Sequence, residues 1–248
     1  MAFSTRIYAD YGMEKKTGTD KYHALGTILE LPDGREFKYA KAGGVALAQG
    51  KTVASAAPIG NHDMDLVTAV NAVGSQTFTC TLGATASTED QYADGYVYTN
   101  DGTGEGQIYR IDSHDAVDSA GDITLNLAEN DKVVVATVAS TLSGLHVNPY
   151  SGVVVSPAAV VTRTVGVPAT AIAASAYGWV QTKGLASVLI GGTTELGEPV
   201  RVHGNSGTAG AVIGLIRGGT NEDEQEVGVM LGVVAATGDY GLVFLNID

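Results

Sequence analysis

Short, strand-length runs that are apolar at many positions fill the last third of the chain, and polar, glycine-containing turns separate them. Six such runs lie between residues 171 and 248: WVQTKG, ASVLIG, EPVRVHG, GAVIGLI, VGVMLGVV and LVFLNID. Short apolar runs bounded by turn residues are typical of β-strands, and closely spaced short strands are typical of antiparallel barrels and sandwiches. We therefore predict a small antiparallel β-barrel or sandwich domain over residues 171–248.

A second group of short strands is predicted in the middle of the chain, over residues 51–170. The runs are QTFTCTL, GYVYTN, GQIYRID, ITLNL and VVVATV, and the segment DGTGEG is typical of a hairpin turn between the second and third. One short helix is predicted over residues 64–73, with Asp63 as its cap and Leu66, Val67 and Val70 on one face. We interpret residues 51–170 as one β-rich domain.

The first 50 residues have a different pattern. The segment GTILELPDGREFKYAKAGG predicts a hairpin, with TILEL and REFKYA as strands and PDG as the turn. Tyrosine, glycine and lysine are frequent before it, which predicts an extended arm that docks on another surface. The overall prediction is an all-β fold of short antiparallel strands in small barrel or sandwich domains, with an extended N-terminal arm over residues 1–50.

Composition and charge support the strand prediction and restrict the function. Hydrophobic residues make up 44% of the chain, enough for a core, whereas charged residues make up only 17%. The formal net charge is −13, which disfavours nucleic acid as a partner because that binding depends on basic residues. The single cysteine, Cys80, lies in a strand-like run, so we expect a buried structural thiol.

The sequence carries no pattern of a secretory leader or a membrane span. The stretch MAFSTRIYADYGMEKK lacks the apolar segment of a signal peptide. No apolar run reaches the roughly 18 residues that a membrane helix needs. We expect a soluble protein without a membrane partner.

Three stretches resemble catalytic motifs but lack essential parts. GGVALAQGKT at residues 43–52 has five residues between Gly44 and Gly50, whereas a phosphate-binding loop has four. GNHD at residues 60–63 stands without the further histidine and aspartate elements of a metal-dependent phosphoesterase. GNSGT has Thr208 where a nucleophile elbow around Ser206 needs glycine. We expect no catalytic residue, no cofactor and no metal.

A series of segments along the chain resembles a known class of proteins. The segments are REFKYAKAGG, DQYADGYVYTNDGTGEGQIYRI, VNPYSGVVV, YGWVQTKG and the C-terminal series LGEPVRV, TAGAVIGLI, EVGVMLGVV and YGLVFLNID. The series resembles virion proteins of tailed bacteriophages that are encoded beside the major capsid protein, the head decoration or cement proteins. The resemblance implies a non-enzymatic protein that is made in the host cytoplasm and binds and stabilises the capsid shell on its outer surface.

The resemblance also implies partners, namely the major capsid protein and further copies of the chain in a homotrimer. We expect the hairpin residues Arg35, Phe37, Lys38 and Tyr39 to contact the shell. An alternative is another β-type virion component, such as a head fibre, tail or receptor-binding module, because tyrosine-rich loops are suited to binding glycans.

The single tryptophan, Trp179, lies in the stretch YGWVQTKG. In a strand, Tyr177, Trp179 and Gln181 share one face, and Gly178, Val180 and Thr182 share the other. Aromatic rings with polar groups are typical of an oligomer interface, but Trp179 is equally suited to anchoring a core, and a ligand site is a third possibility. We expect Tyr177, Trp179 and Gln181 to lie at an oligomer interface, with the core alternative left open.

Overall fold

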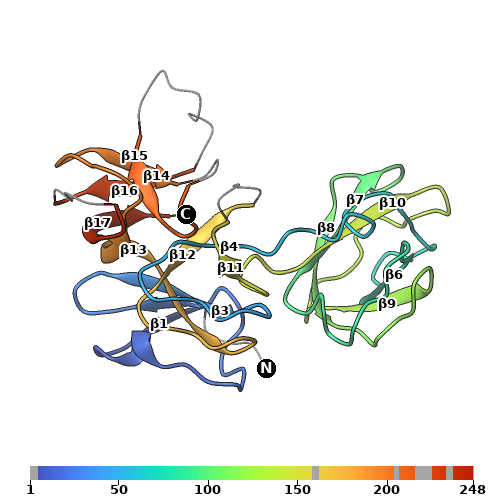
Figure 1. The fold of residues 1–248 in the computed structure, drawn as a ribbon. Helices are drawn as coiled ribbons and strands as arrows, with labels where there is room; N and C mark the ends of the chain where they lie inside the picture. The colour runs from blue at the N-terminus through green and yellow to red at the C-terminus, as the bar shows by residue number, and fades with distance from the viewer. Residues whose placement is uncertain (1–4, 158–161, 204–206, 216–224, 233–236, 248) are drawn as a thin grey trace. The chain divides into compact units, whose positions relative to one another are not determined.

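The computed structural model describes residues 5–157, 162–203, 207–215, 225–232 and 237–247 (Figure 1). The described residues form seventeen strands and one short 3-10 helix, η1 (Met13–Lys15). The prediction of an all-β fold with antiparallel sheets is therefore confirmed. Ser206 lies outside the described residues.

The chain divides into two compact units. Unit 1 consists of residues 1–57 and 149–248, and unit 2 consists of residues 58–148. This division differs from the predicted one at 1–50, 51–170 and 171–248, because the first and last predicted parts share one sheet. Pairing between strands that are far apart in the sequence produces the difference, and alternation within a single segment does not reveal such pairing.

Unit 1 contains one large sheet. Its main path has the order β1-β2-β3-β13-β17-β16-β14-β15. Three further strands lie off this path: β12 pairs with β13 and β4, and β4 also pairs with β11. The strands of the main path are β1 (Arg6–Tyr8), β2 (Ile28–Glu30), β3 (Glu36–Lys41), β13 (Tyr177–Leu189), β14 (Pro199–Val202), β15 (Val212–Gly214), β16 (Glu226–Met230) and β17 (Tyr240–Asn246). The others are β4 (Val53–Ala54), β11 (Val154–Val155) and β12 (Thr164–Pro168).

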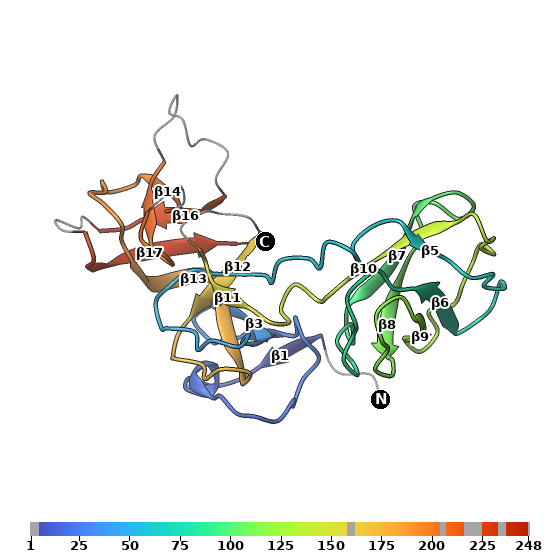
Figure 2. The same ribbon diagram turned by 45° about the vertical axis from the view of Figure 1, so that its right-hand side comes forward.

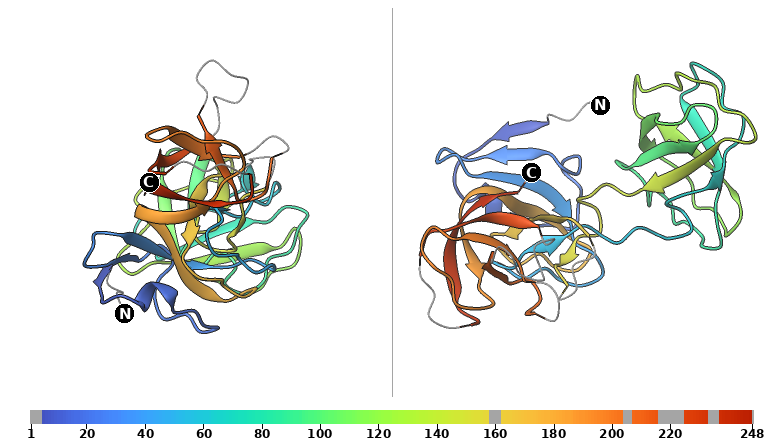
Figure 3. Two further views of the ribbon diagram at one scale, coloured as in Figure 1. Left: turned by 60° about the vertical axis from the view of Figure 1, so that its left-hand side comes forward. Right: turned by 90° about the horizontal axis from the view of Figure 1, so that it is seen from above.

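The predicted N-terminal hairpin is confirmed, but the predicted arm is not. β2 and β3 pair antiparallel, and the turn closes where the Gly34 N–H donates to the Leu31 carbonyl at 2.9 Å. β1 adds to β2 in parallel, so the blue N-terminal strands lie side by side (Figure 3). Leu29 and Phe37 are fully buried. The three N-terminal strands are therefore part of the sheet of unit 1, and the hairpin contributes to its core.

The longest strand, β13, joins two regions of unit 1. It pairs with β3 over Tyr177–Lys183 and with β17 over Lys183–Leu189. Gly184 marks the change of partner with φ +88, a conformation that glycine adopts without a steric penalty. The sequence predicted two separate strands here, WVQTKG and ASVLIG. The chain instead continues through a register shift between Gln181 and Lys183 and forms one strand of 13 residues.

Unit 2 is a barrel-like sheet of six strands (Figure 2). Its strands are β5 (Leu66–Val67), β6 (Thr77–Thr81), β7 (Tyr96–Asp101), β8 (Ile108–Ser113), β9 (Asp122–Leu127) and β10 (Leu142–His146). The order is β5-β10-β7-β8-β9-β6, and a bridge between Thr68 and Cys80 brings the two ends of the sheet together. Cys80 is buried in the core, as expected from the sequence.

Two predicted elements of unit 2 are wrong. Residues 64–73 form the short strand β5 and a loop in place of a helix, and residues 133–138 form no strand. The two segments lie side by side, linked by hydrogen bonds from the Thr137 N–H to the Asn71 carbonyl and from the Gly74 N–H to the Val133 carbonyl. These bonds between segments replace the helical hydrogen bonds, and most of the valines that suggested regular elements are exposed to solvent.

Candidate interaction surface

Strands β3 and β13 bring the two predicted sets of site residues together. In the cross-strand register, Tyr39 lies opposite Trp179, Lys38 opposite Val180, and Phe37 opposite Gln181. The residues expected at the oligomer interface and the residues expected to contact the shell are therefore direct neighbours in one sheet.

Trp179 itself lies in the core of unit 1. Its side chain is 1% exposed, and its ring centroid lies 5.0 Å from that of Tyr39 and 5.4 Å from that of His23. Burial lowers the pKa of His23 because the imidazolium loses hydration there. Of the alternatives left open by the sequence, the structure of the single chain places Trp179 in the core.

Three other predicted site residues are also buried in the single chain: Phe37, Tyr39 and Gln181. The Gln181 side-chain amide donates to the carbonyls of Lys183 and Leu185, at 3.0 and 2.9 Å. These donations satisfy a polar group that would otherwise be costly to bury. Both faces of the first half of β13 are thus occupied within the chain.

Partly exposed aromatic and basic residues surround this buried part. Tyr177 stacks on Tyr39 with centroids 5.7 Å apart, and the Lys41 ammonium lies 5.5 Å from the Tyr177 ring centroid. The Lys38 ammonium lies 5.9 Å from the ring centroid of Tyr150. We call Lys38, Lys41, Tyr150 and Tyr177 the basic–aromatic cluster. These cation–π pairs place positive charge and aromatic rings together in one partly exposed part of the surface.

The second half of β13 belongs to an exposed apolar surface. Leu185 lies opposite Phe244 of β17, and the neighbouring residues of the same faces continue the surface. We define the β13–β17 face as Leu185, Leu231, Tyr240, Leu242 and Phe244. Each of these side chains is between 42% and 50% exposed. The opposite side of the same strands carries the buried residues of the core, including Val188, Val243 and Leu245.

Two pockets flank the β13–β17 face. One, of about 390 Å³, is lined by Asp33, Gly34, Arg35, Lys183, Gly184, Leu185 and Phe244. The other, of about 330 Å³, also includes Arg35 and Leu185, together with Lys15, Gln181 and Tyr240. Arg35, a predicted shell contact, therefore lies at the basic end of the face.

Arg35 is held in place by an ion pair and an aromatic contact. Its guanidinium Nε lies 2.7 Å from an Asp33 carboxylate oxygen, and its Cζ lies 5.7 Å from the Phe37 ring centroid. Desolvation opposes ionisation of Asp33, but hydrogen bonds from the Arg35 side chain and backbone hold the pKa of that carboxyl below its ordinary value. The orientation of Arg35 is thus set within the β2–β3 hairpin.

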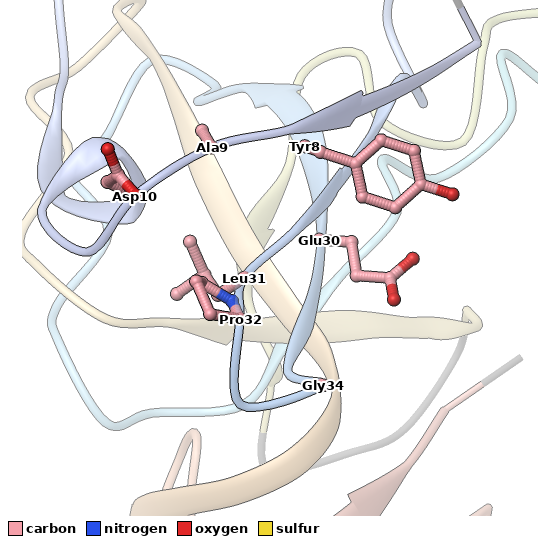
Figure 4. Close-up of a pocket in the computed structure, with 7 residues that line it drawn as sticks. All are labelled: Tyr8, Ala9, Asp10, Glu30, Leu31, Pro32 and Gly34. Carbon is pink, nitrogen blue, oxygen red and sulfur yellow. The ribbon is translucent and has the colours of Figure 1, made fainter.

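A further pocket of about 430 Å³ lies beside β1 (Figure 4). Its lining residues are Tyr8, Ala9, Asp10, Glu30, Leu31, Pro32 and Gly34. The side chains of Tyr8 and Glu30 lie on the same side of the paired strands, and Tyr8 is 74% exposed. The pocket offers a phenol and two carboxylates to a ligand, and its described lining includes no histidine, cysteine or lysine.

Sequence reasoning missed a buried polar network in unit 2. His62 Nε2–H donates to the Thr85 carbonyl at 2.8 Å, which leaves Nδ1 to accept from the Tyr92 hydroxyl at 2.5 Å. The Tyr92 N–H donates to His114 Nε2 at 3.0 Å, and His114 Nδ1–H donates to the Asp115 carbonyl at 2.8 Å. The sequence signal for this network was limited to the GNHD stretch around His62. In the described part of the chain, no three or more His, Cys, Asp or Glu residues gather in a group that could hold a metal ion.

Charge is distributed unevenly between the units. Unit 2 contains 13 of the 27 acidic residues and two of the 14 basic residues, so its net charge is −11 of the total of −13. Unit 1 therefore carries a net charge of only −2, and eight of its basic residues lie within residues 1–57. The apolar β13–β17 face belongs to the nearly neutral unit.

Comparison of the chain with protein-family models, with curated proteins and with solved structures finds no match. Among the described residues, no helix is long and apolar enough to cross a membrane.

Proposed function

We propose that this chain is a non-enzymatic head decoration protein of a tailed bacteriophage, which binds the outer surface of the capsid shell and stabilises it as a homotrimer. Its partners are the major capsid protein and its own copies. The proposal rests first on the resemblance of the sequence segments, and the β-sheet architecture of both units is compatible with it.

The structural observation that carries the proposal is the exposed β13–β17 face. Five large apolar side chains, each nearly half exposed, lie together: four on the adjacent strands β13 and β17, and Leu231 directly after β16. Contiguous apolar patches are uncommon on proteins that act alone, and they are typical of surfaces that another protein covers. In a large assembly, a neighbouring subunit would cover such a face.

The basic–aromatic cluster supports binding to the shell. Lys38 and Lys41 lie beside the rings of Tyr150 and Tyr177, and the exposed Tyr22 lies close to Tyr39. Aromatic and basic side chains contribute strongly to protein–protein contacts when they become desolvated. We propose that this cluster, together with Arg35, contacts the shell.

The test uses expanded shells assembled from the major capsid protein encoded beside this chain. The full-length protein should co-sediment with these shells to a saturating ratio and raise their melting temperature. Lys38→Glu combined with Lys41→Glu should weaken co-sedimentation. The control carries Lys132→Glu, which makes half of this charge change at an exposed lysine of unit 2. Absence of co-sedimentation by the unaltered protein would refute the proposal.

A second candidate function is a head fibre, tail or receptor-binding module. Three tyrosines of the N-terminal region favour it, because Tyr8, Tyr11 and Tyr22 are 74%, 60% and 65% exposed, and exposed aromatic rings are suited to stacking on sugars. Binding of the purified protein to host cells or to a glycan array, lost on replacing the three tyrosines with alanine, would favour this alternative over shell binding.

A further inference from the structure

We infer that the β13–β17 face is the contact through which copies of this chain associate. The inference deepens the proposed function and rests on it for the expectation of three copies. It moves the expected self-contact from Trp179, which is buried within the chain, to the outward side of the second half of the same strand.

The first argument is the continuity of the apolar surface. Leu185 of β13 lies opposite Phe244 of β17, Phe244 opposite Val229 of β16, and Val229 opposite Pro199 of β14. The Leu215 N–H donates to the Pro199 carbonyl, which brings one more apolar residue beside this row. Leu231 and Leu242 extend the surface in a second row, since the Leu231 N–H donates to the Leu242 carbonyl at 2.8 Å.

The apolar residues of the outer face do not contribute to the core of unit 1. The core side of the same strands is already filled by Val188, Val227, Met230, Val243 and Leu245, which are fully buried. An antiparallel sheet with one face in water normally places polar residues on that face. Here the outer face carries five large apolar side chains beside the polar Ser187, which favours a second protein surface as its cover.

Charge favours a second copy as the occupant. Unit 2 carries a net charge of −11, so copies that met through unit 2 would repel each other, whereas unit 1 carries only −2. A strongly basic partner would be drawn to unit 2 and not to the nearly neutral unit 1. The β13–β17 face is thus the place where two copies of an acidic chain can approach.

The charges at the two ends of the face are complementary. Around the Lys183 end of β13, the basic side chains of Lys15, Arg35 and Lys183 outnumber the two carboxylates that pair with them, Asp33 with Arg35 and Glu36 with Lys183. The exposed Glu195 and Asp239 lie beyond the opposite end, where the Ile190 N–H donates to the Asp239 carbonyl. The basic end of one copy can therefore meet the acidic end of the next, and repetition of this contact around a closed ring is compatible with a trimer.

The experiment measures the mass of the full-length protein by native mass spectrometry and by light scattering over a range of concentrations, without shells. We expect an oligomer for the unaltered protein. Leu242→Glu should weaken association at least about tenfold, because it places a charge in the centre of an apolar contact. Val45→Glu is the matched control, since Val45 is also in unit 1, is 73% exposed and lies outside the face. A monomer for the unaltered protein, or an unchanged oligomer for Leu242→Glu, would overturn the inference.

A second measurement does not depend on the folding of the glutamate variant. Ser187 is exposed on the same face, opposite Leu242, and Cys80 is buried, so Ser187→Cys introduces the only accessible thiol among the described residues. A short bifunctional maleimide should link copies of the Ser187→Cys variant and not copies of Val45→Cys. Linkage of Val45→Cys alone would place the contact elsewhere and overturn the inference.

The two proposals fail in different ways. An unaltered protein that forms oligomers through this face but does not bind shells would refute the decoration function and leave the self-contact standing. A monomeric protein that binds shells would refute the self-contact and the homotrimer, and would leave only the shell-binding part of the proposed function standing.

Discussion

Tyr39 of β3 lies directly opposite Trp179 of β13, and their ring centroids are 5.0 Å apart. This pair joins the N-terminal hairpin to the longest strand of the C-terminal half, so it couples two distant parts of the sequence. Leu25, Leu29, Leu31 and Phe37 belong to the same buried cluster. The pair is therefore central to the stability of unit 1.

Replacing Trp179 with alanine should destabilise unit 1 by about 3–5 kcal/mol, because it removes a large buried side chain and leaves a cavity. Urea unfolding followed by circular dichroism measures the loss. Trp179→Phe is the control and should cost less, since it keeps an aromatic ring beside Tyr39. A fully stable Trp179→Ala variant that has lost its oligomeric state would contradict the core position.

Acidification should perturb the environment of Trp179 through His23. The pKa of His23 is lowered by burial, so this imidazole remains neutral in the folded protein until the pH falls below the ordinary value of 6.5. For a lowered histidine pKa, stability is present above the unfolded value and is lost as the pH falls through the folded value.

Fluorescence of the single tryptophan reports this titration, since the His23 ring centroid lies only 5.4 Å from that of Trp179. We expect a change with a midpoint below 6.5 that disappears in His23→Gln. A midpoint above 6.5, or an unchanged transition in His23→Gln, would show that another group is responsible.

Alkaline conditions should destabilise unit 2 through its buried thiol. Burial raises the pKa of Cys80 from 9.0 to about 12. The unfolded chain therefore releases this proton at a lower pH than the folded chain, so the free energy of unfolding should fall as the pH rises above about 9.

Calorimetry of the unaltered protein and of Cys80→Ala tests this expectation, and the variant should show a shallower pH dependence. The native thiol should also react slowly with a thiol reagent at mildly alkaline pH and rapidly after unfolding, because the thiolate is the reactive form. Fast labelling of the folded protein would contradict the buried position of Cys80.

Replacing His62 with phenylalanine should destabilise unit 2 while leaving unit 1 unchanged. The substitution deprives the Tyr92 hydroxyl and the Thr85 carbonyl of their partners, and each buried polar group left without one costs about 1–3 kcal/mol. Asn61→Ala serves as a control at a neighbouring position that is less buried. Loss of a unit 1 transition in calorimetry, with the unit 2 transition unaffected, would contradict this assignment.

Local signals in the sequence predicted local structure well. The PDG turn and its alternating flanks predicted the β2–β3 hairpin, and alternation in ITLNL predicted β9. Alternation also indicated which residues of β13 share a face, but it did not reveal that Trp179 packs against residues of the N-terminal hairpin. This contact results from the pairing of β3 with β13, which joins segments far apart in the sequence.

The exposed apolar β13–β17 face could not be predicted from the sequence. LVFLNID is apolar at nearly every position, so it predicts a strand that is buried on both sides as readily as one with an apolar outer face. The structure distinguishes the two sides of this strand, because Val243 and Leu245 are buried whereas Leu242 and Phe244 are exposed. The His62 network was missed for a related reason, since its partners come from four separate segments of unit 2.

Strands β4 and β11 pair antiparallel, with Ala54 opposite Val154 and Val53 opposite Val155. They therefore hold together the points at which the chain leaves unit 1 near residue 57 and returns near residue 149. We therefore expect that a short glycine-rich loop in place of residues 58–148 would leave every strand of the large sheet intact, since no strand of that sheet lies between these points. The same position is suited to the insertion of a foreign domain.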